Sequence, residues 1–169
     1  MQTAQDFLNK LRHPLWSGFF LFLKLPSAFF SGVRVVYADE MKAEVSVPYK
    51  WFSTNPFKST YFACLGMAAE MSTGLLAMAQ LYKKTPTTSM LIIKSEANFI
   101  KKATGLTRFT CEDGLLIQQT IKEAMASGKS CTIATRSVGV DKAGEIVAEF
   151  IFTWSFRVKR SPQTTTAPL

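Results

Sequence analysis

One long apolar segment constrains the fold of this chain more than any other feature. The stretch NPFKSTYFACLGMAAEMSTGLLAMAQLY, residues 55–82, predicts a single helix and the turn that precedes it. The segment is apolar nearly all round, which is typical of a helix that is covered on most sides. Between Lys58 and Lys83 its single carboxylate is Glu70. The fold must therefore cover this helix, and the lone acid within it needs an explanation.

The rest of the chain predicts antiparallel strands that surround this helix. Alternating residues predict a hairpin over 33–47 that stops at Pro48, and further strands over MLIIKSEANFIKKA and LTRFTCED. A second helix, GLLIQQTIKEAMAS, follows Asp113 as its N-cap and stops at Gly128. The last two strands, CTIATRSVGV and EIVAEFIFTWSFRVK, are joined by a tight turn at DKAG. The final strand places apolar residues on one face: Phe150, Phe152, Trp154, Phe156 and Val158. These elements predict one α+β domain in which an antiparallel sheet curves around the long central helix.

Residues 1–30 predict an additional helical segment that contains PLWSGFFLFLKLPSAFF. The apolar run 19–23 is far shorter than the roughly 20 residues that span a bilayer. The segment also lacks an early basic region and a cleavage site, so we expect no signal peptide. We expect an amphipathic helix that packs on the domain, in preference to membrane contact. The core then covers residues 31–160, and we expect 161–169 to be a disordered tail.

The charge and the cysteines limit the partners and the compartment. A net charge of +8 suits nucleic acid, an anionic membrane or a phosphorylated ligand. No basic and aromatic run typical of RNA-binding strands is present, so we expect a phosphate-bearing ligand and no nucleic acid. Cys64, Cys111 and Cys131 have neither metal-binding spacing nor a disulfide pattern. A reducing compartment, the cytoplasm, suits them best.

Several reaction classes lack their signatures. The sequence has neither GxGxxG nor GxxxxGK[ST], which argues against dinucleotide and P-loop nucleotide sites. Its one histidine, His13, precedes a proline in the first helical segment, where we expect a surface position. Histidine-dependent triads and histidine-ligated zinc are therefore disfavoured. We expect no cofactor and no metal.

Glu70 has two interpretations. Its neighbours at helical spacing are mostly small, which permits close approach of another chain segment or leaves space for a ligand: Ala63, Gly66, Met67, Thr73, Gly74 and Ala77. In the structural interpretation the carboxylate pairs with a base such as Arg34 or Lys94. In the functional interpretation it is a general base or a nucleophile whose pKa is set by its surroundings.

The residues before the helix also have two interpretations. Asn55 is either an Asx turn ahead of Pro56 or an amide that orients a water or a carbonyl group. The backbone N–H groups of Tyr61 and Phe62 fall in the first helical turn, where they suit a developing oxyanion. The alternative is ordinary capping by Ser59 or Thr60.

These residues carry a resemblance to a known superfamily. The chain resembles the hotdog-fold thioesterases over roughly residues 30–160, in particular the PaaI-like branch and the uncharacterised DUF4442 group. The PaaI-like pattern is Asn, five residues, His-Gly-Gly, six residues, then Asp or Glu, and Asn55 and Glu70 match its ends. The intervening triplet is Tyr61-Phe62-Ala63 in place of His-Gly-Gly. The chain is similar to DUF4442 members in lacking that triplet and in the approach VPYKWFSTN.

The resemblance implies a hotdog sheet wrapped around the helix, in a homodimer or a dimer of dimers with its site between subunits. It implies hydrolysis of an acyl-CoA or a related thioester. Glu70 would activate water or attack directly, and Asn55 would position the water or the carbonyl group. The amides of Tyr61 and Phe62 would hold the oxyanion, and lysines would meet the CoA phosphates. The substrate pocket would then be lined by Ala63, Gly66, Met67, Thr73 and Gly74.

From its composition, the Phe-rich N-terminal helix is a candidate wall or lid of an acyl tunnel. The altered triplet leaves open a non-catalytic hotdog protein that binds acyl-thioesters or lipids, whereas a dehydratase would be expected to use a histidine.

Overall fold

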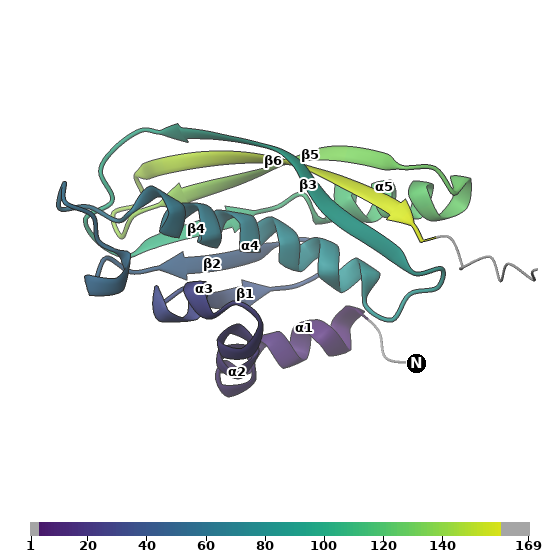
Figure 1. Cartoon of the computed structure of the whole chain (residues 1–169), viewed down its shortest axis with the longest axis horizontal. Helices are drawn as coiled ribbons and strands as arrows, with labels where there is room; N and C mark the ends of the chain where they lie inside the picture. The colour runs from purple at the N-terminus through teal and green to yellow at the C-terminus, as the bar shows by residue number, and fades with distance from the viewer. Residues whose placement is uncertain (1–3, 160–169) are drawn as a thin grey trace, which may run out of the picture.

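The computed structural model describes residues 4–159 and combines one sheet with five α-helices (Figure 1). The helices are α1 (Ala4–Arg12), α2 (Pro14–Lys24), α3 (Pro26–Phe30), α4 (Phe62–Leu81) and α5 (Gly114–Ser127), with a 3₁₀ turn, η1 (Trp51–Ser53). The strands are β1 (Arg34–Ala38), β2 (Ala43–Val47), β3 (Thr88–Phe99), β4 (Thr107–Cys111), β5 (Cys131–Val140) and β6 (Ile146–Val158).

The strands form a six-stranded sheet in the order β1-β2-β4-β5-β6-β3, and every neighbouring pair is antiparallel. The sheet curves along α4, which lies against its concave side (Figure 1). The inward face of β6 is buried at Phe150, Phe152, Trp154 and Phe156. This confirms the predicted α+β class, the antiparallel sheet and the long central helix.

The central helix α4 begins at Phe62, with Tyr61 as the N-cap residue, and follows a turn within residues 55–61, as predicted. By length and composition α4 is apolar enough to cross a membrane, but 67% of that window is buried inside the fold. Its contacts with β2, β4, β5 and β6 account for this burial. α4 is therefore the core helix of the domain.

The N-terminal helices lie along the β1 edge of the sheet and contact α4 (Figure 1). α1 buries Phe7, Leu8 and Leu11, and the Phe7 ring stacks on Tyr82 with centroids 4.9 Å apart. In contrast, α2 buries only Ser17 and Leu21. The segment therefore packs on the domain mainly through α1, and most of α2 faces outward.

The two edges of the sheet differ. β1 is short, interrupted by a bulge, and covered by α1 and α2. Nε of Arg12 also donates a 2.6 Å hydrogen bond to the Ala38 carbonyl. β3 is twelve residues long and pairs only with β6 among the described strands, with Leu91 65% and Ile93 54% exposed. β3 also carries the exposed pair Lys94–Glu96 and a register shift between Ile92 and Lys94, and its long uncovered edge is a template for pairing with another strand.

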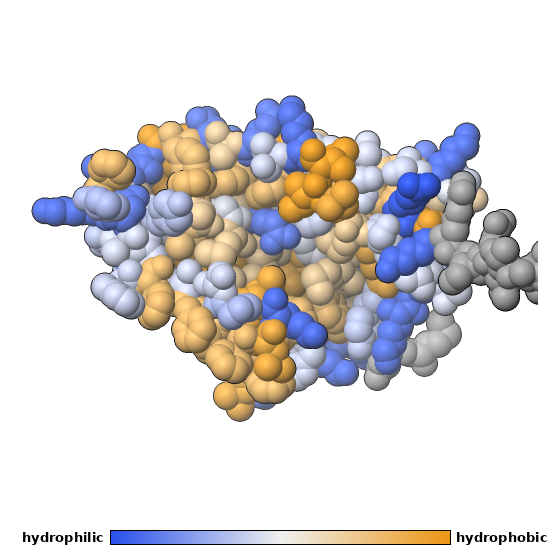
Figure 2. Space-filling view, in the orientation of Figure 1, coloured by the Kyte–Doolittle hydropathy of each residue, from blue (hydrophilic) through white to orange (hydrophobic). Residues whose placement is uncertain are grey.

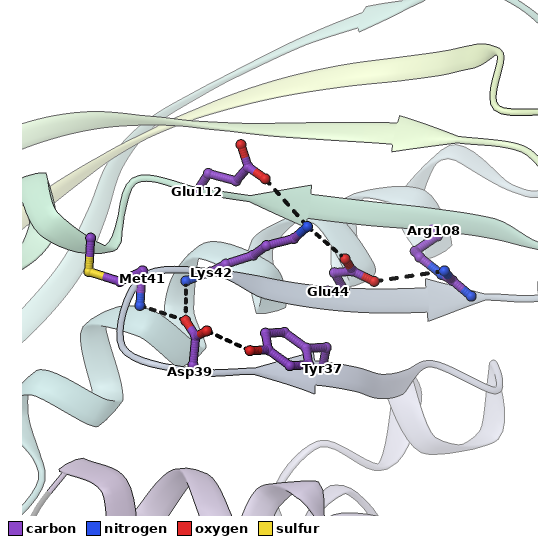
Figure 3. A network of polar contacts seen from close by, with 7 residues as sticks. All are labelled: Tyr37, Asp39, Met41, Lys42, Glu44, Arg108 and Glu112. Atoms are coloured by element: carbon purple, nitrogen blue, oxygen red, sulfur yellow. Dashed lines mark hydrogen bonds and ion pairs between the residues drawn. The ribbon is translucent and has the colours of Figure 1, made fainter.

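A polar network lies on the outer side of β1, β2 and β4 (Figure 3). Asp39 Oδ1 accepts 2.7 Å hydrogen bonds from the amides of Met41 and Lys42, which fixes the β1–β2 turn. Lys42 pairs with Glu44 at 3.0 Å and reaches Glu112 at 3.4 Å. Tyr37 and Arg108 complete the network, which gives this part of the sheet a solvated polar face.

Candidate functional site

Glu70 faces a small cavity between α4 and the N-terminal helices. The cavity has a volume of about 160 Å³. It is lined by Leu11, Ser17, Phe20, Leu21, Leu25, Val35, Glu70, Met71, Gly74, Leu75 and Met78. All of these except Ser17 and Glu70 are apolar or glycine. Among the described residues, Glu70 therefore contributes the one ionisable side chain of a mainly apolar cavity.

The Glu70 carboxylate has no ion-pair or hydrogen-bond partner among residues 4–159. Neither base named for the structural interpretation reaches it. Arg34 donates to the Val33 carbonyl at 2.7 Å and lies over a phenylalanine ring, and Lys94 pairs with Glu96 on β3. Burial disfavours the charged form and raises the pKa of the Glu70 carboxyl above its usual value. An unpaired acid with a raised pKa in a cavity is suited to proton transfer.

Gly74 and Trp154 define the space beside this carboxylate. A Cβ atom at position 74 would lie 3.1 Å from Glu70 Oε1 and 3.6 Å from the Trp154 ring. Trp154 is fixed in turn, because its Nε1–H donates a 3.0 Å hydrogen bond to Thr73 Oγ1. Thr73 Oγ1 itself donates to the Glu70 backbone carbonyl at 2.9 Å. The indole is thereby tied to the helical turn that carries the acid.

Asn55 forms the Asx turn that was its alternative interpretation. Its Oδ1 accepts hydrogen bonds from the amide of Phe57 at 2.9 Å and the amide of Ser59 at 3.3 Å. Asn55 also lines an open cavity of about 720 Å³ at the start of α4, together with Tyr61, Phe62 and Lys102. The structure therefore places Asn55 and Glu70 in different cavities of one chain.

The amides at the start of α4 are not equivalent. The Tyr61 N–H donates a 2.7 Å hydrogen bond to the Ser53 carbonyl, so Tyr61, one of the two predicted oxyanion donors, is already engaged. The N–H groups of Phe62 and Ala63 have no acceptor among the described residues. No side chain caps this end, so the alternative interpretation, capping by Ser59 or Thr60, is wrong. The donors available to an anion are therefore those of Phe62 and Ala63.

The remaining predicted pocket residues are divided between several places. Ala63 and Gly66 line a groove of about 310 Å³ between α4 and the edge formed by β3 and β6. Gly74 lies with Glu70, Thr73 is fully buried, and Met67 packs against the core. Phe62 lines both the groove and the cavity at the start of α4. Within one chain these positions follow one side of α4 without forming one cavity.

Sequence reasoning did not assign two residues of this region. Trp154 was recognised only as a core residue, although an indole N–H needs a partner when it is buried. Ser17 contributes the one other polar side chain in the Glu70 cavity, and its hydroxyl donates to the Pro14 carbonyl at 3.2 Å. Its signal is a small polar residue in an otherwise apolar helix.

Comparison with known proteins identifies the architecture. No family model and no curated protein matches the sequence. Among solved structures, a Pseudomonas aeruginosa protein described as a probable thioesterase matches with a TM-score of 0.72 and 21% identity, covering 86% of this chain and 97% of that one. A Chlorobaculum tepidum protein of unknown function matches with a TM-score of 0.73 and 14% identity, covering 93% and 98%. The chain has a hotdog fold.

A second Pseudomonas aeruginosa structure, a mutant named as a thioesterase, matches this hotdog with a TM-score of 0.63 and 15% identity, covering 89% of this chain and 93% of that one. At such identities the similarity establishes the fold of the sheet and its central helix. The coverage extends to most of the chain. Similarity at this level carries no reaction over to this hotdog, whose own candidate groups are Glu70 and the free amides of α4.

Proposed function

We propose that this hotdog protein hydrolyses acyl-thioesters, with acyl-CoA as the substrate class and Glu70 as the catalytic acid–base. The observation that carries the proposal is the Glu70 carboxylate, which is unpaired, has a raised pKa and faces an apolar cavity. The thioesterase names of the neighbouring structures support the same reaction class. The composition of the cavity suits an acyl chain beside the reacting carbonyl group.

The reaction needs one base and one oxyanion site. Glu70 takes a proton from water, and the water oxygen forms a bond to the thioester carbonyl carbon. The negative charge that develops on the carbonyl oxygen is stabilised by N–H groups and by the positive end of the α4 dipole, for which the amides of Phe62 and Ala63 are available. The C–S bond then breaks, and the thiolate takes up a proton. Direct attack by the Glu70 carboxylate, followed by hydrolysis of the resulting anhydride, is the alternative route.

This reaction requires a second subunit. Phe62 and Glu70 are eight positions apart on one helix, which corresponds to about 12 Å along its axis. One carbonyl group cannot contact both, so we infer that the amides of one subunit serve Glu70 of its partner. The uncovered edge of β3, with Leu91 and Ile93 exposed, supports pairing of two sheets into a homodimer, alone or within a dimer of dimers.

The region at the start of α4 suits the CoA end of the substrate. Its cavity of about 720 Å³ includes Lys101 and Lys102 and opens to the surface. Lys101 is held by Asp141 and Glu145, whereas within residues 4–159 Lys102 donates only to the Phe57 carbonyl, at 3.3 Å. We therefore propose Lys102 as a phosphate contact.

The three free thiols support placement in the reducing cytoplasm.

A second function, binding of acyl-thioesters without turnover, is favoured by two observations. The Asn55 side chain is committed to its Asx turn, so it is not free to orient a substrate. The half-exposed Phe62 ring also stands where the resembling family has a glycine beside the carbonyl group.

A panel of acyl-CoAs decides between these functions. Thiol release is measured for the wild type, for Glu70→Gln and for the matched control Glu123→Gln, which removes an exposed carboxylate from α5. Hydrolysis requires release by the wild type and the control but not by Glu70→Gln. Binding by calorimetry without release from any of the three proteins supports the second function. Equal release by Glu70→Gln and the wild type contradicts the assignment of Glu70.

A further inference from the structure

The outward face of α2 consists of large apolar side chains. Five residues of this eleven-residue helix are exposed on one side: Leu15, Trp16, Phe19, Phe22 and Leu23. The side that packs on the domain contributes Ser17 and Leu21. A helix that is apolar on its solvent side as well as its inner side is normally covered by something else.

The apolar face continues beyond α2 through a chain of ring contacts. The Phe22 ring lies 5.3 Å from Phe29 and 6.2 Å from Phe30, measured between centroids. Phe30 lies 5.8 Å from Phe52 of η1, and Phe52 lies 4.7 Å from Trp51. These residues and the five of α2 form one surface, here called the α2 surface. Figure 2 shows apolar side chains gathered over the N-terminal helices, where this surface lies.

Basic residues predominate around the α2 surface, and one acid, Asp6 of α1, lines a cavity with Lys10, Leu15 and Trp16. The residues of the α2 surface come from two stretches, 14–38 and 45–69, which contain no aspartate and no glutamate. The same stretches contain four exposed basic residues: Lys24, Arg34, Lys50 and Lys58. An apolar face with basic residues around it is complementary to an anionic bilayer surface.

We propose that the α2 surface docks this protein on the surface of an anionic lipid bilayer. α2 lies in the interfacial plane, with Phe19 and Leu23 inserted and Trp16 and Trp51 at the level of the headgroups. Lys24 and Lys50 contact anionic headgroups. An eleven-residue helix is too short to span the bilayer, so the contact is peripheral. A second copy of the chain is a poorer occupant, because a two-fold contact would bring these like charges together.

The docked geometry places the Glu70 cavity next to the lipid. Ser17, Phe20, Leu21 and Leu25, on or at the end of α2, line that cavity from the side opposite the bilayer-facing residues. α2 therefore separates the bilayer from the cavity by the thickness of one helix. Docking does not depend on the proposed hydrolysis, and a protein that only binds acyl chains would dock in the same way.

Co-sedimentation with vesicles tests the proposal. The full chain is mixed with vesicles of phosphatidylcholine, with or without phosphatidylglycerol. The wild type is expected to sediment with the phosphatidylglycerol vesicles and to be released from them by salt. Phe19→Gln with Leu23→Gln is expected to weaken binding roughly tenfold or more, and Lys24→Glu with Lys50→Glu to abolish the preference for phosphatidylglycerol. Because all four side chains are exposed, the folded state should persist, which the thermal midpoint verifies.

The matched control is Leu115→Gln with Leu116→Gln, which removes two exposed apolar residues from α5. This control is expected to bind vesicles like the wild type. The proposal is overturned if the wild type stays in solution with both vesicle types, or if Phe19→Gln with Leu23→Gln binds as well as the wild type. A lower solution mass of that variant with unchanged vesicle binding would assign the α2 surface to contact between copies instead.

Discussion

Gly74 lies directly against the carboxylate of Glu70: a Cβ atom at position 74 would stand only 3.1 Å from Glu70 Oε1. The other side of that Cβ atom would meet the Trp154 ring at 3.6 Å. Glycine therefore leaves free the space beside both the Glu70 carboxylate and the Trp154 ring. A substitution at position 74 should therefore change the activity of the protein more than its stability.

Gly74→Ala should lower hydrolysis without unfolding the protein. The added methyl group would crowd Glu70 Oε1, so the carboxylate must shift by a few tenths of an ångström, and we expect kcat to fall by roughly threefold to tenfold. Alanine stabilises a helix by about 1 kcal/mol relative to glycine, which offsets the crowding. Thiol-release kinetics and urea unfolding measure the two effects. Gly18→Ala in α2, where a Cβ atom meets nothing within 4 Å, is the control for helix propensity and should keep full activity. Full activity of Gly74→Ala would mean that the carboxylate position is unimportant.

The hydrogen bond between Trp154 and Thr73 should appear as a coupling energy. Thr73→Val and Trp154→Phe each remove one partner of a buried 3.0 Å bond, and each should reduce the free energy of unfolding by about 1–3 kcal/mol. The double variant should lose less than the sum of the two, by about 1 kcal/mol. Urea unfolding of the four proteins measures this difference. Strict additivity would show that the bond does not contribute to stability.

The pH dependence of stability should reveal the unpaired acid. Because burial raises the pKa of Glu70 in the folded state, the folded protein binds this proton more tightly than the unfolded chain. The stabilisation from protonated Glu70 is complete below the unfolded value of about 4.5 and is lost as the pH rises through the folded pKa. Glu70→Gln should therefore be more stable than the wild type at pH 7, and the difference should shrink as the pH falls towards 4.5. A difference that is constant with pH would mean that Glu70 titrates normally.

The elements of this fold were predictable because their signals are local. The alternation of β6 and the apolar length of α4 predicted the sheet and its central helix. The spacing of Asn55 and Glu70 predicted them as site residues. Spacing does not predict which groups their side chains contact in the folded protein. The Tyr61 amide bonds to the Ser53 carbonyl, a contact created by the fold of the loop that precedes α4.

The N-terminal segment shows the limit of periodicity. The run PLWSGFFLFLK predicts a helix but does not predict which of its sides is buried, because both sides are apolar. Which side faces inward is decided by contacts with β1 and α1. Asp113 illustrates the same limit. It occupies the predicted N-cap position, but its carboxylate accepts the Arg136 amide at 2.7 Å instead of capping α5.

The edge of β3 should be the subunit contact. The wild-type mass by light scattering should be at least twice 18.8 kDa. Leu91→Lys with Ile93→Lys places two charges beside the uncovered edge, and this variant should have the monomer mass. It should also lose hydrolysis, because the Phe62 and Ala63 amides and the Glu70 of one site come from different subunits. A monomeric variant with full activity would contradict a site shared between subunits.

The most direct test of Glu70 is the pH profile of kcat/KM for acyl-CoA hydrolysis. The base must be deprotonated to act, so the rate should rise with pH through an acid limb whose midpoint lies above 4.5, the usual pKa of a glutamate. Glu70→Gln should remove that limb and lower kcat/KM at least a hundredfold, while Glu123→Gln leaves the profile unchanged. An identical acid limb in the Glu70→Gln variant would contradict the account.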